Sequence, residues 1–210
     1  MASLSLGSDV LVATPSAGQK EFNGTIFTGA PTSTTRGIIP TEQFYALNAG
    51  LTGANVFATP QNILGVGVTL AGSTQYEFEL MFTLAKSAGT TSHTISLGFG
   101  GTATINSIIA QIVYPTAGTS TSTPPTGTPS NIGVIVSATA SAFGSAITSA
   151  AASAIYIIKG TVSINAGGTF IPQYTLSAAP GGAYTTQAGS YMKIKPIGVS
   201  GANVSVGTWA

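Results

Sequence analysis

The alternation of residues 74–84, TQYEFELMFTL, constrains the fold more than any other feature of the sequence. Large apolar side chains at Tyr76, Phe78, Leu80, Phe82 and Leu84 alternate with Glu77, Glu79, Met81 and Thr83. A repeat of two residues is the repeat of a β-strand, in which successive side chains point to opposite faces. We therefore expect a strand that buries one face and carries the two glutamates on the other.

Further strand-like segments surround this one and are separated by turn residues. We expect strands within residues 63–70, 94–99, 102–114, 159–176, 191–197 and 204–209. Their predicted buried side chains include Ile95, Leu97, Phe99, Val162, Ile164, Phe170, Tyr174 and Leu176. The glycine-containing segments 71–73 and 166–168 are expected to be hairpin connections.

Two stretches are less regular. Residues 116–130, TAGTSTSTPPTGTPS, are rich in chain-breaking residues and predict an exposed loop. Residues 137–154 are rich in alanine, and the spacing of Phe143 and Ile147 permits a short helix, but the β-branched residues and Gly144 favour irregular chain plus strand. The sequence therefore predicts an all-β protein, with one antiparallel two-sheet, jelly-roll-like sandwich spanning residues 21–210.

Residues 1–20 are predicted to form a separate extended arm. Its apolar residues are Leu4, Leu6, Val10, Leu11 and Val12. The segment is too short to hold a core of its own, and the alternative is a frayed terminus. We expect the arm to become ordered on a partner chain, which makes these five residues a candidate assembly interface.

The low charge content limits the functions that the surface of this protein can serve. Only 5% of the residues are charged, against about 25% in ordinary soluble domains. No carboxylate side chain follows Glu79, and residues 87–158 contain no charged side chain. Soluble monomers normally carry a mixed charged surface, although threonine-rich surfaces are also soluble. We expect this surface of small and hydroxyl side chains to be covered extensively by neighbouring chains.

Several partners and locations are disfavoured by the same composition. A net charge of +1 supplies no basic field for nucleic acid. Residues 134–158 are long enough to span a bilayer, but they are mostly Ala, Ser and Thr with Gly144 inside, so we expect no membrane span. Residues 1–18 lack a basic start and a continuous apolar core, so we expect no signal peptide. The sequence has no cysteine, which excludes disulfides and thiolate metal sites.

The chemically reactive side chains form no recognised catalytic pattern. Glu77 and Glu79 are expected on one face of one strand, and we interpret that face as solvated or subunit-facing rather than as a hydrolytic pair. A calcium site built from these glutamates and backbone carbonyls remains open, although no ligand-loop motif supports it. His93 is the only histidine, and without a Gly-x-Ser-x-Gly elbow we interpret it as a turn or strand-edge residue. We expect no catalytic, cofactor-binding or metal-binding residues, and no enzyme.

Three segments carry a family resemblance. Residues 21–47 begin with a Glu-aromatic-x-Gly motif and lead to Arg36-Gly37 and Pro40; the second segment is 62–105; the third is 157–198, with GTW at 207–209. The third is the most specific, because Lys-Gly, Gly-Gly-Thr-Phe-x-Pro and Ala-Ala-Pro-Gly-Gly occur there together. In this order the segments resemble a jelly-roll module of tailed-bacteriophage virion structural proteins. The resemblance implies a jelly-roll-like fold, a homotrimer and a place on the particle surface, and it supplies no catalytic residues.

The leading hypothesis is a capsid decoration, or cement, protein that docks as an oligomer on the outer shell. Its partners would be its own copies and the major capsid protein, where it would stabilise capsomer contacts. Typical members of the family carry a long upstream region, and a chain without one favours a head protein. The alternative is a tail or tail-fibre module that contacts the host surface through residues 116–130 and 178–190, with Tyr184 as a candidate for stacking on sugar.

Overall fold

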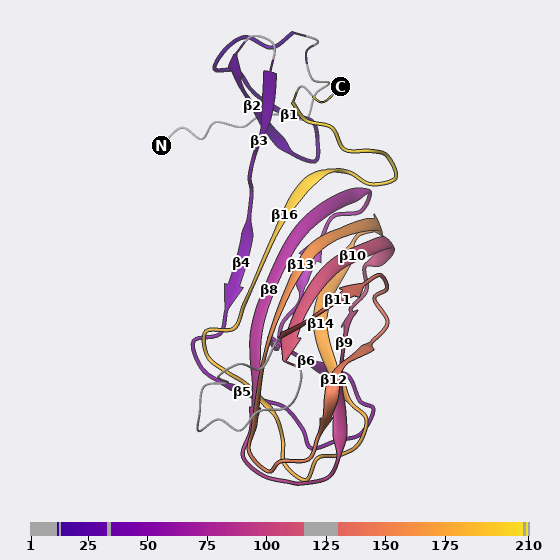
Figure 1. The fold of residues 1–210 in the computed structure, drawn as a ribbon. Helices are drawn as coiled ribbons and strands as arrows, with labels where there is room; N and C mark the ends of the chain where they lie inside the picture. The colour runs from indigo at the N-terminus through magenta and orange to yellow at the C-terminus, as the bar shows by residue number, and fades with distance from the viewer. Residues whose placement is uncertain (1–11, 13, 33–34, 116–129, 208, 210) are drawn as a thin grey trace.

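The computed structural model describes residues 12, 14–32, 35–115, 130–207 and 209. This part of the chain contains β-strands and no helix, and its strands form three antiparallel sheets (Figure 1). Two of the sheets pack face to face as a sandwich, so the predicted all-β, antiparallel sandwich is confirmed.

The larger sheet has eight strands and is organised around β8 (Thr74–Lys86), the segment with the strongest alternation. Its other strands are β4 (Gln43–Ala46), β5 (Leu51–Thr52), β10 (Thr104–Pro115), β11 (Ser130–Ile135), β13 (Ala152–Ala166), β15 (Thr185–Thr186) and β16 (Tyr191–Val199). Their order is β11-β10-β13-β8, after which both β16 and β15 pair with the far side of β8; β16 is followed by β4 and β15 by β5. β8 therefore lies in the interior of the sheet, with both of its sides hydrogen bonded.

The second sheet has five strands and covers one face of the first (Figure 1). Its strands are β6 (Gln61–Asn62), β7 (Val68–Leu70), β9 (His93–Gly100), β12 (Ser141–Ile147) and β14 (Gly168–Leu176). Their order is β12-β9-β14, and β14 also pairs with β6 and β7. Between β7 and β14 the chain changes sheet at every connection except β10–β11, and this repeated crossing makes the sandwich jelly-roll-like.

Two predicted hairpins are wrong because the chain changes sheet at these connections. Residues 71–73 join β7 to β8, and residues 166–168 overlap the ends of β13 and β14, but in both cases the joined strands belong to different sheets. β8 has no free side for β7, because it pairs with β13 on one side and with β16 and β15 on the other. Gly72 lies so close to Gly167 that a Cβ on Gly72 would be 2.9 Å from the Gly167 nitrogen, so the two crossings pack against each other.

The space between the two sheets contains the predicted core. All five apolar residues of the β8 alternation are buried, and so are the apolar residues predicted for β9, β13 and β14. The rings of Phe99 and Phe170 stack at 4.7 Å, and Phe78 of the opposite sheet meets Phe99 edge-on at 5.6 Å. Contacts of this kind between sheets bury large apolar area, and that burial is what holds a sandwich together.

Residues 20–39 form a sheet of their own. Its strands are β1 (Lys20–Phe22), β2 (Phe27–Thr32) and β3 (Thr35–Ile39), and they lie beyond one end of the sandwich, joined to it through β4 (Figure 1). An ion pair of 2.7 Å between Arg36 and Glu21 links β3 to β1. The sequence placed all of residues 21–210 in one sandwich, whereas the sandwich strands begin at β4.

The remaining expectations have mixed outcomes. Residues 141–147 and 152–166 are strands, so irregular chain plus strand is confirmed for 137–154. The closing strand predicted at 204–209 is wrong for the described residues, since 204–207 and 209 have no strand pairing. The loop predicted at 116–130 lies outside the described residues up to 129, and Ser130 begins β11.

Candidate assembly surface

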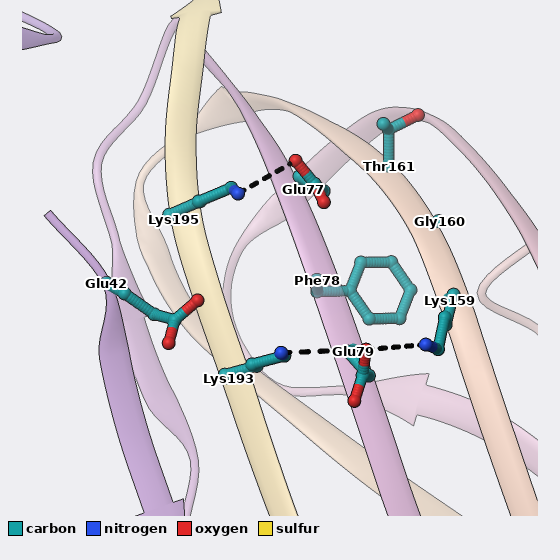
Figure 2. Close-up of a pocket in the computed structure, with 9 residues that line it drawn as sticks. All are labelled: Glu42, Glu77, Phe78, Glu79, Lys159, Gly160, Thr161, Lys193 and Lys195. Carbon is teal, nitrogen blue, oxygen red and sulfur yellow. Dashed lines mark ion pairs between the residues drawn. The ribbon is translucent and has the colours of Figure 1, made fainter. Parts of the chain in front are cut away.

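Charged side chains gather on the outer face of the eight-stranded sheet, around β8. Three of the five acidic and three of the six basic residues line a shallow depression of about 310 Å³ there (Figure 2). Five of them form the group that we call the charge ladder: Glu77, Glu79, Lys159, Lys193 and Lys195. Glu79 binds Lys159 at 2.9 Å and Lys193 at 3.6 Å, and Glu77 binds Lys195 at 3.2 Å.

Strand register builds the charge ladder. Lys159 of β13 and Lys193 of β16 are both directly opposite Glu79, and Lys195 is opposite Glu77. Opposite charges in directly facing positions stabilise a strand pair, and a slip of one residue would turn these side chains towards the core. The ladder therefore favours the observed register on both sides of β8.

Glu79 is held in its ionised form. It accepts a hydrogen bond of 2.5 Å from the Tyr191 hydroxyl, and this bond, with the one from Lys159, lowers the pKa of Glu79 below its usual value. The same bond to Glu79 raises the pKa of Tyr191. A carboxylate stabilised in this way is a poor proton donor and a weak base, so the arrangement favours a structural role over acid–base chemistry.

One edge of the sandwich carries no charged side chain. We call this the uncharged side: β11 and β12, which are the last strands of the two sheets at the same side of the molecule. Tyr114 and Phe143 join the two sheets there, with ring centroids 5.4 Å apart. Ile132, Val134 and Val136 expose 66%, 61% and 70% of their area, and Ile109 of β10 exposes 60% beside them. Exposed apolar residues in such a cluster mark an interaction surface.

A buried ammonium group links the two regions. Lys86, the last residue of β8, is 5% exposed, and its Nζ donates to the carbonyl oxygens of Ala88, Gly89, Ser149 and Ala150. The first two acceptors follow β8 and the other two follow β12, so one side chain ties the end of the central strand to the uncharged side. Gly89 has a φ of +83°, and a Cβ there would lie 2.0 Å from the Pro180 carbonyl oxygen, so the turn requires glycine. Burial lowers the pKa of Lys86.

His93 and Tyr184 form a buried pair close to Lys86. Their ring centroids are 5.6 Å apart, and a hydrogen bond of 2.8 Å joins His93 Nε2 to the Tyr184 hydroxyl. The Thr91 carbonyl, 2.7 Å from His93 Nδ1, can only accept, so the neutral ring carries its proton on Nδ1 and accepts from Tyr184. Burial and the positive charge of Lys86 lower the pKa of His93, and burial raises the pKa of Tyr184.

These positions revise two sequence interpretations. His93 begins β9, as expected for a strand-edge residue, but it is 1% exposed and belongs to the interior. Tyr184 is fully buried, so its interpretation as a sugar-stacking loop residue is wrong. Its phenol ring fills the end of the core, where its hydroxyl group is hydrogen bonded to His93.

The predicted assembly residues of the arm fall mostly outside the described part. Leu4, Leu6, Val10 and Leu11 lie outside the described residues. Val12 is described: it exposes 43% of its area, its N–H donates to Glu21 at 2.9 Å and its carbonyl accepts from Arg36.

The structure adds positions that the sequence interpretation passed over. The exposed residues of β11 were not identified from the sequence, because residues 131–136, NIGVIV, have the apolar composition of a short buried strand. The strand order of the structure shows that β11 lies at the end of a sheet. The signal available in the sequence was the absence of charge over residues 87–158, which include all of β9 to β12.

The described residues contain neither a cluster of metal ligands nor a membrane-spanning helix. No group of three or more His, Cys, Asp or Glu side chains there is placed to hold a metal ion. Glu77 and Glu79, the open calcium candidates, both bind ammonium groups instead. The described residues include no helix that is long and apolar enough to cross a bilayer.

Comparison with known proteins leaves the family unassigned. Neither a protein-family model nor a curated protein matches the sequence. One solved structure contains a weakly similar chain; its title is "Structure of infectious bursal disease virus Gt strain". The similarity covers 74% of the present chain, with 10% sequence identity and a TM-score of 0.11. The similar region covers 41% of that chain. A likeness this weak carries no argument about fold or function.

Proposed function

We propose that this protein is a virion structural protein of a tailed bacteriophage, a capsid decoration or cement protein that docks on the outer shell. The observation that carries an assembly role is the uncharged side, where four large apolar residues are each at least 60% exposed: Ile109 of β10, Ile132 and Val134 of β11, and Val136 directly after β11. A monomer that exposes such a cluster to water loses the free energy that burial would supply, roughly 25 cal/mol per Å² of apolar surface. The placement in a phage particle rests on the sequence resemblance.

The distribution of polar groups supports a structural role. The carboxylates of the charge ladder are engaged by lysines, and His93 is buried with its ring nitrogens hydrogen bonded. A nucleophile or general base needs an accessible group that is free to exchange protons with a substrate. The mechanism that we propose is therefore burial of apolar and small side chains between this chain, its copies and the major capsid protein.

The copy number in purified particles tests this proposal. Quantitative mass spectrometry of particles should give a number of the same order as that of the major capsid protein. A number far below that of the shell protein would assign the chain to the tail, and absence from the particle would refute a virion role. If the protein cements the shell, particles stripped of it should release their DNA at a lower temperature than intact particles when both are heated.

A further inference from the structure

The end strands of the described sheets differ in how they are protected against pairing with another chain. Natural sheets protect their edges with short strands, charged residues, proline or bulges. β5, β6 and β7 have only two or three residues, β4 has four, and β1 and β3 carry charged side chains. β12 has an irregular register between Phe143 and Ile147, with Gly144 at a φ of +87°.

β11 has none of these protections. It has six residues, SNIGVI, without charge or proline, and all six pair with β10 with no shift of register. Among the described residues no strand pairs with its other side. Half of its backbone N–H and C=O groups therefore point away from β10, and another β-strand satisfies such a row completely.

We infer that β11 pairs with β11 of a second copy of this chain, antiparallel and about a twofold axis. Ile132 and Val134 of β11, and Val136 directly after it, are exposed in alternation and are all β-branched. Self-pairing centred on Val134, with the strand extended by this one residue, places Ile132 opposite the partner's Val136 and Val134 opposite its own copy. Pairs of β-branched residues in facing positions stabilise antiparallel strands. A twofold contact of one surface with itself is also the commonest way in which proteins assemble.

The absence of charged residues near β11 favours a second copy of this chain over a charged partner strand. The nearest charged residue in the cross-strand row through Val134 is Lys159, two strands away. In the paired form the two Lys159 residues would be five strand spacings apart, about 24 Å, which is well beyond the screening length at physiological salt. Two copies therefore approach without repulsion, whereas a charged partner strand finds no opposite charge on β11.

This inference deepens the proposed function, since it names the partner of the uncharged side, but it makes a separate prediction about stoichiometry. A twofold β11 pair gives a dimer, whereas the family resemblance implies a trimer. The solution state of the purified protein tests the pairing, and the copy number in particles tests the virion role, so the two can fail independently.

Sedimentation equilibrium of the full chain and two variants is the experiment. Val134→Lys places two like charges opposite each other at the twofold axis and should weaken the dimer by about a hundredfold or more. Ile155→Lys is the matched control: Ile155 is 49% exposed on the same sheet face, but it belongs to β13, an interior strand. Circular dichroism and the melting temperature establish that both variants are folded.

The expected result is a dimer for the wild type and for Ile155→Lys, and a monomer for Val134→Lys. A wild type that stays monomeric at about 100 µM, which would mean negligible affinity, would overturn the inference. A trimer that survives Val134→Lys would also overturn it. Equal weakening by both variants would mean that copies associate through the sheet face rather than through its edge, and this too would contradict the pairing.

Discussion

The charge ladder and β11 of the uncharged side belong to the same eight-stranded sheet, yet they meet their surroundings in opposite ways. Around β8, each strand has neighbours on both sides and the polar face is neutralised by its own ion pairs. At β11, the apolar face is exposed and one side of the strand has no described partner. The comparison teaches that the few charges of this chain neutralise one another at the centre of the sheet, while the end for which we propose association carries none.

The largest effect is expected at Lys86, which joins the two regions. Lys86→Met removes a buried ammonium group that donates to four carbonyl oxygens, so the free energy of unfolding should fall by about 2–3 kcal/mol. Lys195→Met is the matched control, because Lys195 makes one partly exposed ion pair and should cost about 0.5 kcal/mol or less. Urea unfolding followed by circular dichroism gives both values, and equal losses would mean that the carbonyl contacts of Lys86 contribute little.

A smaller loss is expected in the centre of the charge ladder. Glu79→Ala leaves Lys159 and Lys193 without their shared carboxylate and Tyr191 without its acceptor, so the free energy of unfolding should fall by about 1–2 kcal/mol. Glu77→Ala, at a more exposed carboxylate with one lysine partner, should cost no more than about 0.5 kcal/mol. A reversed order in urea titrations of the two variants would contradict the central place given to Glu79.

Mild acid should loosen the end of the sandwich before it affects the ladder. The pKa of His93 is lowered from 6.5, so its contribution to stability is present above that pH and is lost as the pH falls towards its lower folded value. The pKa of Glu79 is lowered from 4.5, so the ladder loses stability only at lower pH. The melting temperature should therefore fall between about pH 7.5 and pH 5.5 in the wild type, and less steeply in His93→Gln. Parallel slopes in the two proteins would exclude His93 as the responsible group.

The smallest effect is the response to salt. Raising NaCl from about 0.05 M to 1 M should weaken the ladder by a few tenths of a kcal/mol, because exposed ion pairs are screened. A Glu77→Gln, Lys195→Gln double variant removes one pair without changing net charge and should show a smaller loss, which separates screening from general salt effects on the core. Identical salt dependence in the two proteins would mean that this pair adds no measurable stability.

The sequence was sufficient to predict which residues face the core between the sheets, but it was insufficient to predict how the strands are connected. Alternation in residues 74–84 placed Phe78, Leu80 and Phe82 in the core and Glu77 and Glu79 outside it, because side-chain direction in a strand depends only on position along the chain. It could not show that residues 71–73 and 166–168 cross between sheets, because a short glycine turn serves a hairpin and a crossing equally well.

The candidate surface was predictable only in part. A lack of charge over residues 87–158 indicated that a surface of this chain would be covered, but charge content does not give strand order. The ladder depends on Lys159 and Lys193, which are distant from Glu79 in sequence and reach it only through the registers of β13 and β16. Tyr184 was misplaced because an aromatic residue among glycines resembles a loop residue, whereas its ring closes one end of the core.

Hydrogen–deuterium exchange of residues 130–135 as a function of protein concentration tests the central claim most directly. If β11 is the association strand, its outward amides should exchange slowly in concentrated protein and become faster on dilution, while exchange in β8 stays the same at every concentration. If exchange in β11 is fast and independent of concentration while residues of the charge ladder become protected, copies associate through the charged face and the account is wrong.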